Sequence, residues 1–186
     1  MIVIIGPSGI GKTTWARRLV KENPTRLALA TTATTRTPRP DEHPGRDYFF
    51  LSDDAFEDAS GLDLFIERDF FDGHHYGIPR ASLDIVTSLG LTPVVVLTSN
   101  GASDQRVRCR TDLCVALLPR YESILSNRRS GRAHKHGLTD VPDRGTEPLV
   151  NFQIAAHKII WLDPHESDQF QELQLEVDAA LKRKET

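Results

Sequence analysis

Residues 2–14 read Ile2-Val3-Ile4-Ile5-Gly6-Pro7-Ser8-Gly9-Ile10-Gly11-Lys12-Thr13-Thr14. An apolar run is followed at once by the pattern G-x-x-x-x-G-K-[ST], which forms a phosphate-binding loop between a buried strand and a helix. The glycines let the backbone approach phosphate oxygens with its amide N–H groups pointing inward. The helix that starts near Lys12 adds the positive end of its dipole. Residues 6–14 are therefore predicted to hold the phosphates of a nucleotide.

Two side chains at the end of this loop have predicted roles. Lys12 supplies a mobile charge for the outer phosphates, and the Thr13 hydroxyl is placed to ligate Mg²⁺. The alternative is a glycine turn that binds nothing. The strand before the loop and the amphipathic stretch after it, with Trp15, Leu19 and Val20, favour the phosphate site.

Composition limits the class of protein. A chain of 186 residues, 39% hydrophobic and 26% charged, is typical of one globular domain with small inserted lobes. The net charge of −3 gives no general attraction to nucleic acid, so we expect no such partner. Cys109 and Cys114 match no zinc or redox spacing. Because no stretch approaches about 20 apolar residues and the first apolar run stops at Gly6, we expect a cytoplasmic protein without membrane contact.

Strands and helices alternate along the chain. Strands are predicted at 2–5, 27–30, 48–51, 64–66, 76–78, 93–97, 113–118 and 158–162. Helices are predicted at about 12–22, from the cap Ser52, and at 79–89, 120–129, 147–157 and 169–184. This order predicts a single α/β domain over 1–186, with a three-layer P-loop NTPase core around a parallel sheet. The core comprises 1–30, 79–129 and 147–186. A small mixed or antiparallel lobe is inserted at 31–78, and an arginine-rich lid at 130–146.

A second segment narrows the class. It reads Thr34-Thr35-Arg36-Thr37-Pro38-Arg39-Pro40 and continues in Gly45-Arg46-Asp47-Tyr48-Phe49-Phe50, Phe65-Ile66-Glu67 and Gly73-His74-His75-Tyr76-Gly77. These stretches resemble the T-T-R-x-P-R-x-x-E…G-x-D-Y-x-F, F-[IL]-E and G-x-x-Y-G patterns of the guanylate kinase family. The resemblance covers residues 2 to about 98 and becomes loose beyond residue 100.

The resemblance implies a kinase that uses ATP with Mg²⁺ to phosphorylate a nucleoside monophosphate, GMP or dGMP, bound by residues 31–78. Arg36 and Arg39 suit a monophosphate dianion, since guanidinium groups offer permanent, bidentate donors. Tyr48 and Tyr76 offer phenolic donors to the same phosphate. Glu67 can accept from the N1–H and the exocyclic amine of guanine, and the family implies Thr32 near the base. The alternative is that the arginines are solvated loop charges and the tyrosines belong to the core.

The chain departs from the family pattern at two places. The family has acidic residues at the end of the strand corresponding to 94–98, one near the metal and one that helps to read the base. Here Val96-Leu97-Thr98-Ser99-Asn100 has no carboxylate, and Ile78 replaces a small hydroxyl residue. We therefore expect Thr13 and water to hold Mg²⁺ with less help from other protein side chains. Glu67 would discriminate between bases nearly alone. We therefore expect a smaller preference for guanine over other bases than the family pattern implies.

The third segment is rich in arginine, with Arg128-Arg129-Ser130-Gly131-Arg132 and then Arg144-Gly145. Guanylate kinases have a lid whose arginines fold over the ATP phosphates. Arg128 suits the preceding helix, and either Arg132 or Arg144 matches the lid arginine. An exposed basic loop is the alternative. Histidines at 74, 75, 134 and 136 lack partner ligands at metal-binding spacing, so we expect no metal there.

The sequence thus predicts in-line transfer of a phosphoryl group from ATP to GMP or dGMP, with Lys12, Arg36, Arg128 and Arg132 or Arg144 as the groups that stabilise the transferring charge. Two alternatives stay open. One is a kinase of the same fold with another acceptor, either a different nucleotide or a ribose bisphosphate. The other is a non-catalytic module that binds a protein partner; such modules typically lose the lysine that Lys12 represents. The sequence is compatible with a monomer or a homodimer.

Overall fold

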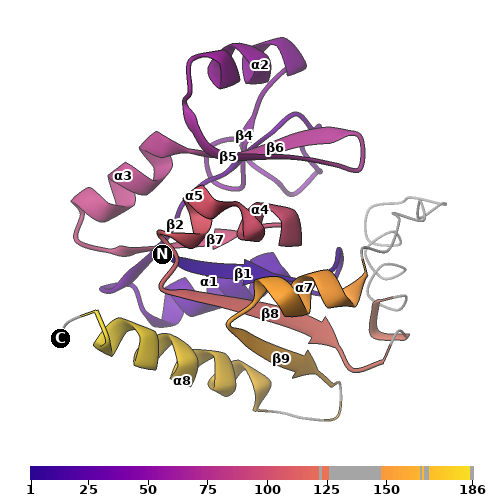
Figure 1. Cartoon of the computed structure of the whole chain (residues 1–186), viewed down its shortest axis with the longest axis vertical. Coiled ribbons are helices and arrows are strands. Elements are labelled where there is room, and N and C mark those ends of the chain that lie inside the picture. Colours follow the sequence, from indigo (N-terminus) through magenta and orange to yellow (C-terminus); the bar gives the residue numbers. More distant parts are fainter. Residues whose placement is uncertain (122, 126–147, 164, 166–167, 185–186) are drawn as a thin grey trace.

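The computed structural model describes residues 1–121, 123–125, 148–163, 165 and 168–184 (Figure 1). The predicted lid at 130–146, and with it Arg128, Arg132 and Arg144, lies outside the described residues. None of the helices in the described ranges is long and apolar enough to cross a membrane.

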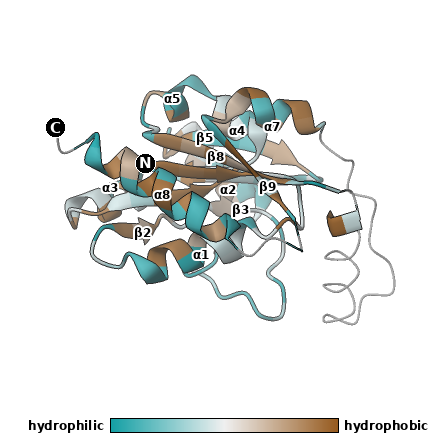
Figure 2. Ribbon diagram, turned by 90° about the horizontal axis from the view of Figure 1, so that it is seen from below, coloured by the Kyte–Doolittle hydropathy of each residue, from teal (hydrophilic) through white to brown (hydrophobic). Residues whose placement is uncertain are grey.

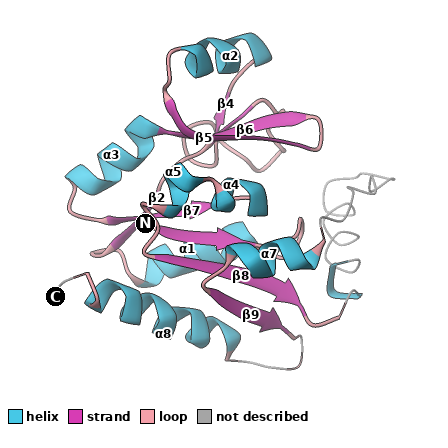
Figure 3. Cartoon of the chain, viewed as in Figure 1, coloured by secondary structure: helices cyan, strands magenta, loops and turns pink. Residues whose placement is uncertain are grey.

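A parallel sheet of five strands forms the centre of the molecule, in the order β2-β7-β1-β8-β9 (Figure 3). Its strands are β1 (Ile2–Ile5), β2 (Leu27–Leu29), β7 (Thr92–Val96), β8 (Leu113–Pro119) and β9 (Lys158–Leu162). In register, Ile2 lies opposite Val94 on one side and Leu113 on the other. All five were predicted, because buried parallel strands are short apolar runs that stand out in the sequence.

Helices cover both faces of this sheet. On one face Ile2 and Ile4 pack with α1 (Lys12–Glu22) and α8 (Gln169–Lys182). On the other, Val3 and Ile5 pack with the helices α3 (Arg80–Ser88), α4 (Ser99–Ser103), α5 (Gln105–Arg108) and α7 (Leu149–Ala155). Figure 2 shows the hydrophobic strands between α4, α5 and α7 on one side and α1 on the other. The predicted three-layer α/β core is confirmed.

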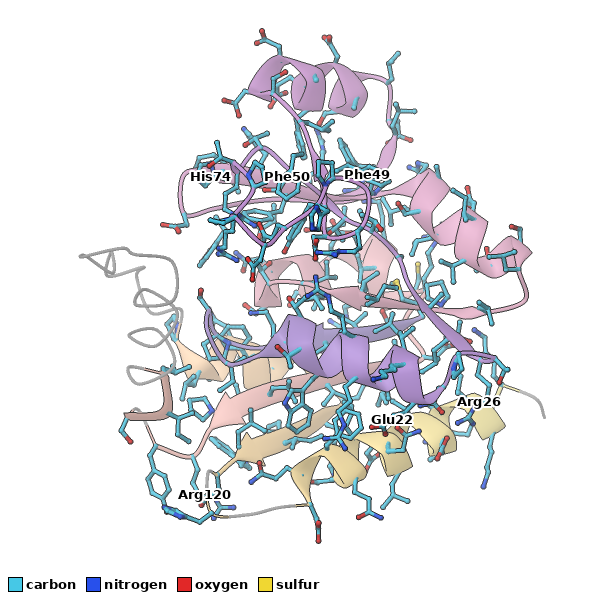
Figure 4. All side chains as sticks on the ribbon, turned by 180° about the vertical axis from the view of Figure 1, so that it is seen from behind. Glu22, Arg26, Phe49, Phe50, His74 and Arg120 are labelled. Carbon is cyan, nitrogen blue, oxygen red and sulfur yellow. The ribbon has the colours of Figure 1, made fainter. Side chains whose placement is uncertain are left out.

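A second, mixed sheet builds the small lobe, in the order β4-β3-β6-β5. Its elements are β3 (Ala33–Thr34), β4 (Phe49–Phe50), α2 (Asp53–Gly61), β5 (Phe65–Phe71) and β6 (His74–Pro79). β3 pairs in parallel with β4 and antiparallel with β6, which pairs antiparallel with β5. The rings of Phe56 and Phe65 stack at 4.5 Å in its core. Ser52 caps α2, as predicted, by accepting from the Ala55 N–H at 3.2 Å. Figure 4 labels Phe49, Phe50 and His74 in this lobe, with Glu22, Arg26 and Arg120 on the core.

Two features were not predicted. β3 falls between the strands predicted at 27–30 and 48–51, where no strand was predicted, yet Ala33 and Thr34 are fully buried. Its burial was hidden by the polar, proline-rich residues around it. The short helices α4 and α5 follow the end of β7 and pack against β5. They lack apolar periodicity and depend instead on the caps Thr98 and Asp104, whose side chains accept from the N–H groups of Gly101 and Arg106.

Candidate functional site

The phosphate loop joins β1 to α1, and glycine is required at its first position. Gly6 has φ +149°, and a Cβ there would stand 2.3 Å from the Leu117 carbonyl oxygen of β8. Gly11, with φ 102°, begins α1 from a left-handed conformation. Ile10 is fully buried and donates its N–H to the Pro7 carbonyl at 3.2 Å. The loop is thus anchored in the core through Gly6, Pro7 and Ile10, which are buried.

Lys12 lies folded over this loop. Its Nζ donates to the carbonyl oxygens of Gly6 and Pro7 at 2.7 and 3.2 Å. Thr13 and Thr14 follow in the first turn of α1 and are exposed, whereas Ser8 and Gly9 are half-buried. The ammonium charge and two hydroxyls are therefore placed at one helix N-terminus, where an anion is favoured.

Glu42 holds Arg36 and Arg39 together. Its two carboxylate oxygens accept from Arg36 Nη2 at 3.0 and 2.9 Å, and Oε1 also accepts from Arg39 Nη1 at 3.2 Å. Although burial opposes its ionisation, hydrogen bonds from the Arg39 backbone N–H and the Arg36 guanidinium lower the pKa of Glu42. Glu42 therefore stays charged and fixes the two arginines. We did not single it out from the sequence, although it occupies the acidic position of the T-T-R-x-P-R-x-x-E pattern.

Tyr48 lies beside Arg36, and Tyr76 lies beside Tyr48. Their ring centroids are 6.4 Å apart, and the guanidinium carbon of Arg36 lies 5.5 Å from the centre of the Tyr48 ring. Burial raises the pKa of the Tyr48 phenol, so it remains a protonated donor near neutral pH. Thr32 is half-buried just before β3, where its carbonyl accepts from the Phe49 N–H at 2.9 Å. The lobe thus gathers two guanidinium groups and two phenols, a donor set suited to a phosphate dianion.

The lobe is tied to the core next to the phosphate loop. The Arg17 guanidinium, on α1, contacts the buried carboxylate of Asp47. The other oxygen of Asp47 accepts from the His43 N–H at 2.8 Å. Since α1 begins at the phosphate loop, this ion pair joins the lobe to the helix that carries Lys12.

Glu67 is the buried acid of the site. It lies on β5, is only 2% exposed, and its Oε1 is 2.6 Å from where a Cβ on Gly101 would stand. Burial, and then the negative charges of Asp69 and Asp104, raise the pKa of Glu67 to about 8. Gly101 of α4, which has no side chain, therefore lies over the carboxyl group of Glu67, whose pKa is close to neutral.

This pKa predicts how stability depends on pH. As pH rises from 4.5 to about 8, Glu67 ionises in the unfolded chain but stays protonated in the native one. The native state then binds more protons than the unfolded state, so the free energy of unfolding falls, by on the order of a few kcal/mol. We expect the stability of Glu67→Gln relative to wild type to increase over that interval, measured by urea unfolding at pH 5, 6.5 and 8. A difference that is constant with pH would contradict the prediction.

A second carboxylate stands close to Glu67 and was missed in the sequence. Thr98, at the end of β7, donates its hydroxyl to Asp69 Oδ2 at 2.5 Å. The structure thus brings a carboxylate from β5 to the strand end where residues 96–100 supply none. Residues two apart on a strand lie on the same face, but the predicted strand ended at residue 66 and β5 continues to Phe71, so this spacing was not used.

Comparisons with known proteins identify the family of this chain. The family model described as "Guanylate kinase" matches residues 1–124. The chain is 42% identical over 106 residues to a guanylate kinase of Prochlorococcus marinus, covering 57% of each chain. It is 37% identical over 132 residues to that of Thermosynechococcus vestitus, covering 71% of this chain and 69% of the other. It is 36% identical over 134 residues to the guanylate kinase of Caulobacter vibrioides, covering 72% of this chain and 62% of that one. The match thus spans about three fifths to two thirds of these relatives.

Solved structures show the same fold. The guanylate kinase of Anaplasma phagocytophilum superposes with a TM-score of 0.69 at 20% identity, covering 99% of this chain and 85% of that one. The SH3-kinase fragment of tight junction protein 3 has a TM-score of 0.50 at 9% identity, covering 96% and 56%. At these identities the likeness concerns the fold alone.

Proposed function

Because this chain belongs to the guanylate kinase family, we propose that it transfers the γ-phosphoryl group of ATP to a nucleoside monophosphate, with GMP or dGMP as acceptor. One observation carries the proposal. A complete phosphate loop with Lys12 folded over it lies in the same fold as a lobe that gathers Arg36, Arg39, Tyr48 and Tyr76.

The donor half of the site is residues 6–14. Their backbone N–H groups would bind the ATP phosphates, with Lys12 Nζ exchanging its carbonyl partners for phosphate oxygens. Thr13 presents an exposed hydroxyl in the first turn of α1, an oxygen donor of the kind that Mg²⁺ takes. One protein oxygen fits this ion, which usually keeps several waters and is bound mainly through substrate phosphates. When bound, Mg²⁺ would neutralise part of the phosphate charge.

The acceptor half holds the monophosphate between Arg36, Arg39 and the two tyrosines. The attacking phosphate oxygen is already anionic, so neither a covalent intermediate nor a strong general base is needed. Catalysis then depends on positioning and on charge neutralisation. Arg36 lies between the two phosphates in this proposal. Arg128, with Arg132 or Arg144, would supply further charge over the moving group.

Glu67 would read the base. Ionised, it accepts from the N1–H and the exocyclic amine of guanine, an edge that presents two adjacent donors. Adenine presents no hydrogen on N1. A site built to pair buried polar groups rejects bases that leave those groups unpaired.

Arg39→Ala tests the acceptor half. A charged hydrogen bond contributes about 1.5–3 kcal/mol, so the KM for the monophosphate should rise about 10- to 100-fold. The KM for ATP should change little, because Arg39 touches one substrate only. Steady-state kinetics with each substrate varied measure both, with the exposed Arg68→Ala of β5 as a control. An equal rise in both KM values would show that Arg39 has a general structural role instead.

The proposed activity itself is tested by product analysis. Protein, Mg²⁺ and ATP are incubated with and without GMP, and the nucleotides are separated by chromatography. We expect ADP and GDP in equal amounts, and no ADP without an acceptor. ADP formed without GMP, or no GDP at all, would overturn the proposal.

A further inference from the structure

Two carboxylates of β5 lie near the start of α4: Glu67 faces Gly101, which has no side chain, and Asp69 bonds to Thr98 beside it. Glu67 and Asp69 are two residues apart on the strand and so lie on the same face. The point where a Gly101 Cβ would stand is 2.6 Å from Glu67 Oε1 and 3.4 Å from the Thr98 hydroxyl. That hydroxyl is the group bonded to Asp69. Glu67 and the Asp69–Thr98 pair therefore belong to one cluster.

The hydrogen bonds fix the orientation of Asp69. Thr98 Oγ1 accepts from the Gly101 N–H at 3.0 Å, so its own proton is directed to Asp69 Oδ2. Asp69 Oδ1 accepts from the Phe70 N–H at 2.9 Å. Each carboxylate oxygen has two lone pairs, so both retain a free acceptor position. The group is held in place and can still receive hydrogen bonds from a ligand.

The cluster is short of positive charge. Within the described residues, no lysine, arginine or histidine forms a salt bridge with Glu67 or Asp69. The adjacent Arg106 pairs instead with Asp104, at 3.2 Å. The negative charge of Asp69 opposes the ionisation of Glu67, and a ligand that brings N–H donors favours the ionised form. Such an arrangement is typical of a binding site.

We propose that Asp69, oriented by Thr98, is a second base-reading carboxylate that accepts a hydrogen bond from the 2-amino group of guanine. The inference rests on the proposed function and deepens it. Glu67 takes N1–H and one amino hydrogen, and Asp69 takes the other. The acid absent from residues 96–100 is thus supplied by β5, which revises our expectation that Glu67 discriminates between bases nearly alone.

Inosine monophosphate distinguishes the role of Glu67 from that of Asp69, because it keeps the N1–H group of guanine and lacks the 2-amino group. We expect Asp69→Asn to lower kcat/KM for GMP about 10-fold or more and to leave kcat/KM for inosine monophosphate within about twofold. Glu67→Gln should lower both. Asp84→Asn, an exposed acid on α3, is the matched control and should change neither.

A structural role for Asp69 would give another result. The Asp69–Thr98 bond also links β5 of the lobe to the N-cap of α4 in the core. If it served only as that link, Asp69→Asn would lower kcat/KM for both acceptors equally, and the inference would be overturned. If wild type does not phosphorylate GMP, the proposed function fails and this inference fails with it. If wild type prefers GMP and the GMP-to-inosine ratio is unchanged in Asp69→Asn, this inference alone fails.

Two further variants keep the test independent of one substitution. Thr98→Val keeps the branched shape and removes the hydroxyl that orients Asp69, so the GMP-to-inosine ratio should fall a few-fold. Asp69→Ala/Thr98→Asp moves the acid onto the end of β7. It should recover most of the ratio lost in Asp69→Ala, with thermal unfolding confirming that each variant is folded. A double variant no better than Asp69→Ala, together with an unchanged ratio in Thr98→Val, would overturn the inference.

Discussion

Lys12→Ala should lower kcat by about 10²–10³-fold or more, the range seen when one preorganised donor to a developing charge is removed. Lys12 Nζ lies over the phosphate loop, 2.7 Å from the Gly6 carbonyl, where it can follow the charge of the phosphoryl group during transfer. Lys12 is itself only half-buried, and its removal leaves the backbone of the loop in place, so the fold should remain intact. Single-turnover rates with saturating ATP and GMP measure the effect.

Lys21→Ala is the control for Lys12, because it removes an exposed lysine from the last turn of the same helix. It should leave kcat unchanged, and circular dichroism should show both variants folded. Near-normal turnover in Lys12→Ala would rule out the assigned role. It would also favour the reading of this chain as a binding module.

Glu67→Gln should remove most of the preference for guanine. The amide has the size of the carboxyl group but loses its charge and presents a donor where an acceptor is needed. Since buried sites reject ligands that leave polar groups unpaired, we expect the kcat/KM ratio of GMP to AMP to fall about 100-fold or more. Relative to wild type, the variant should gain stability as pH rises toward 8, because burial raises the pKa of Glu67 to about 8. Circular dichroism at the assay pH should show the variant folded, so that lower activity does not reflect unfolding.

The control for Glu67 is Glu57→Gln, which neutralises an exposed acid of α2 in the same lobe. It should leave the GMP-to-AMP ratio unchanged. A Glu67→Gln enzyme with the preference order and ratios of wild type would show that the base is read elsewhere.

Local signals allowed the core of the fold to be predicted from the sequence. The phosphate loop is one short motif, and apolar runs such as Val94–Val96 mark buried strands whatever surrounds them. The glycine at position 6 is explained by its φ of +149° and its contact with Leu117, which only the structure shows. The end of the phosphate loop and the start of α1 at Lys12 fall where the motif places them.

The features that escaped prediction depend on contacts between distant segments. Asp69 and Thr98 are 29 residues apart and meet only because α4, which Thr98 caps, packs against β5. In the sequence, Glu42 looks like any other charged loop residue. Only the folded chain brings its carboxylate into contact with Arg36 and Arg39. Helix α4 begins at a polar Ser-Asn-Gly stretch and is set by its Thr98 cap rather than by an apolar pattern. The lid arginines remain predictions.

The most direct test of the central claim is a competition experiment. Equal concentrations of GMP, AMP, CMP and dTMP are mixed with the protein, Mg²⁺ and a limiting amount of ATP, and the diphosphates are separated. Their ratios give the ratios of kcat/KM without any fitted constant. The account predicts that GDP is the dominant product. A dominant diphosphate with any other base, or ATP left unconsumed, would contradict it.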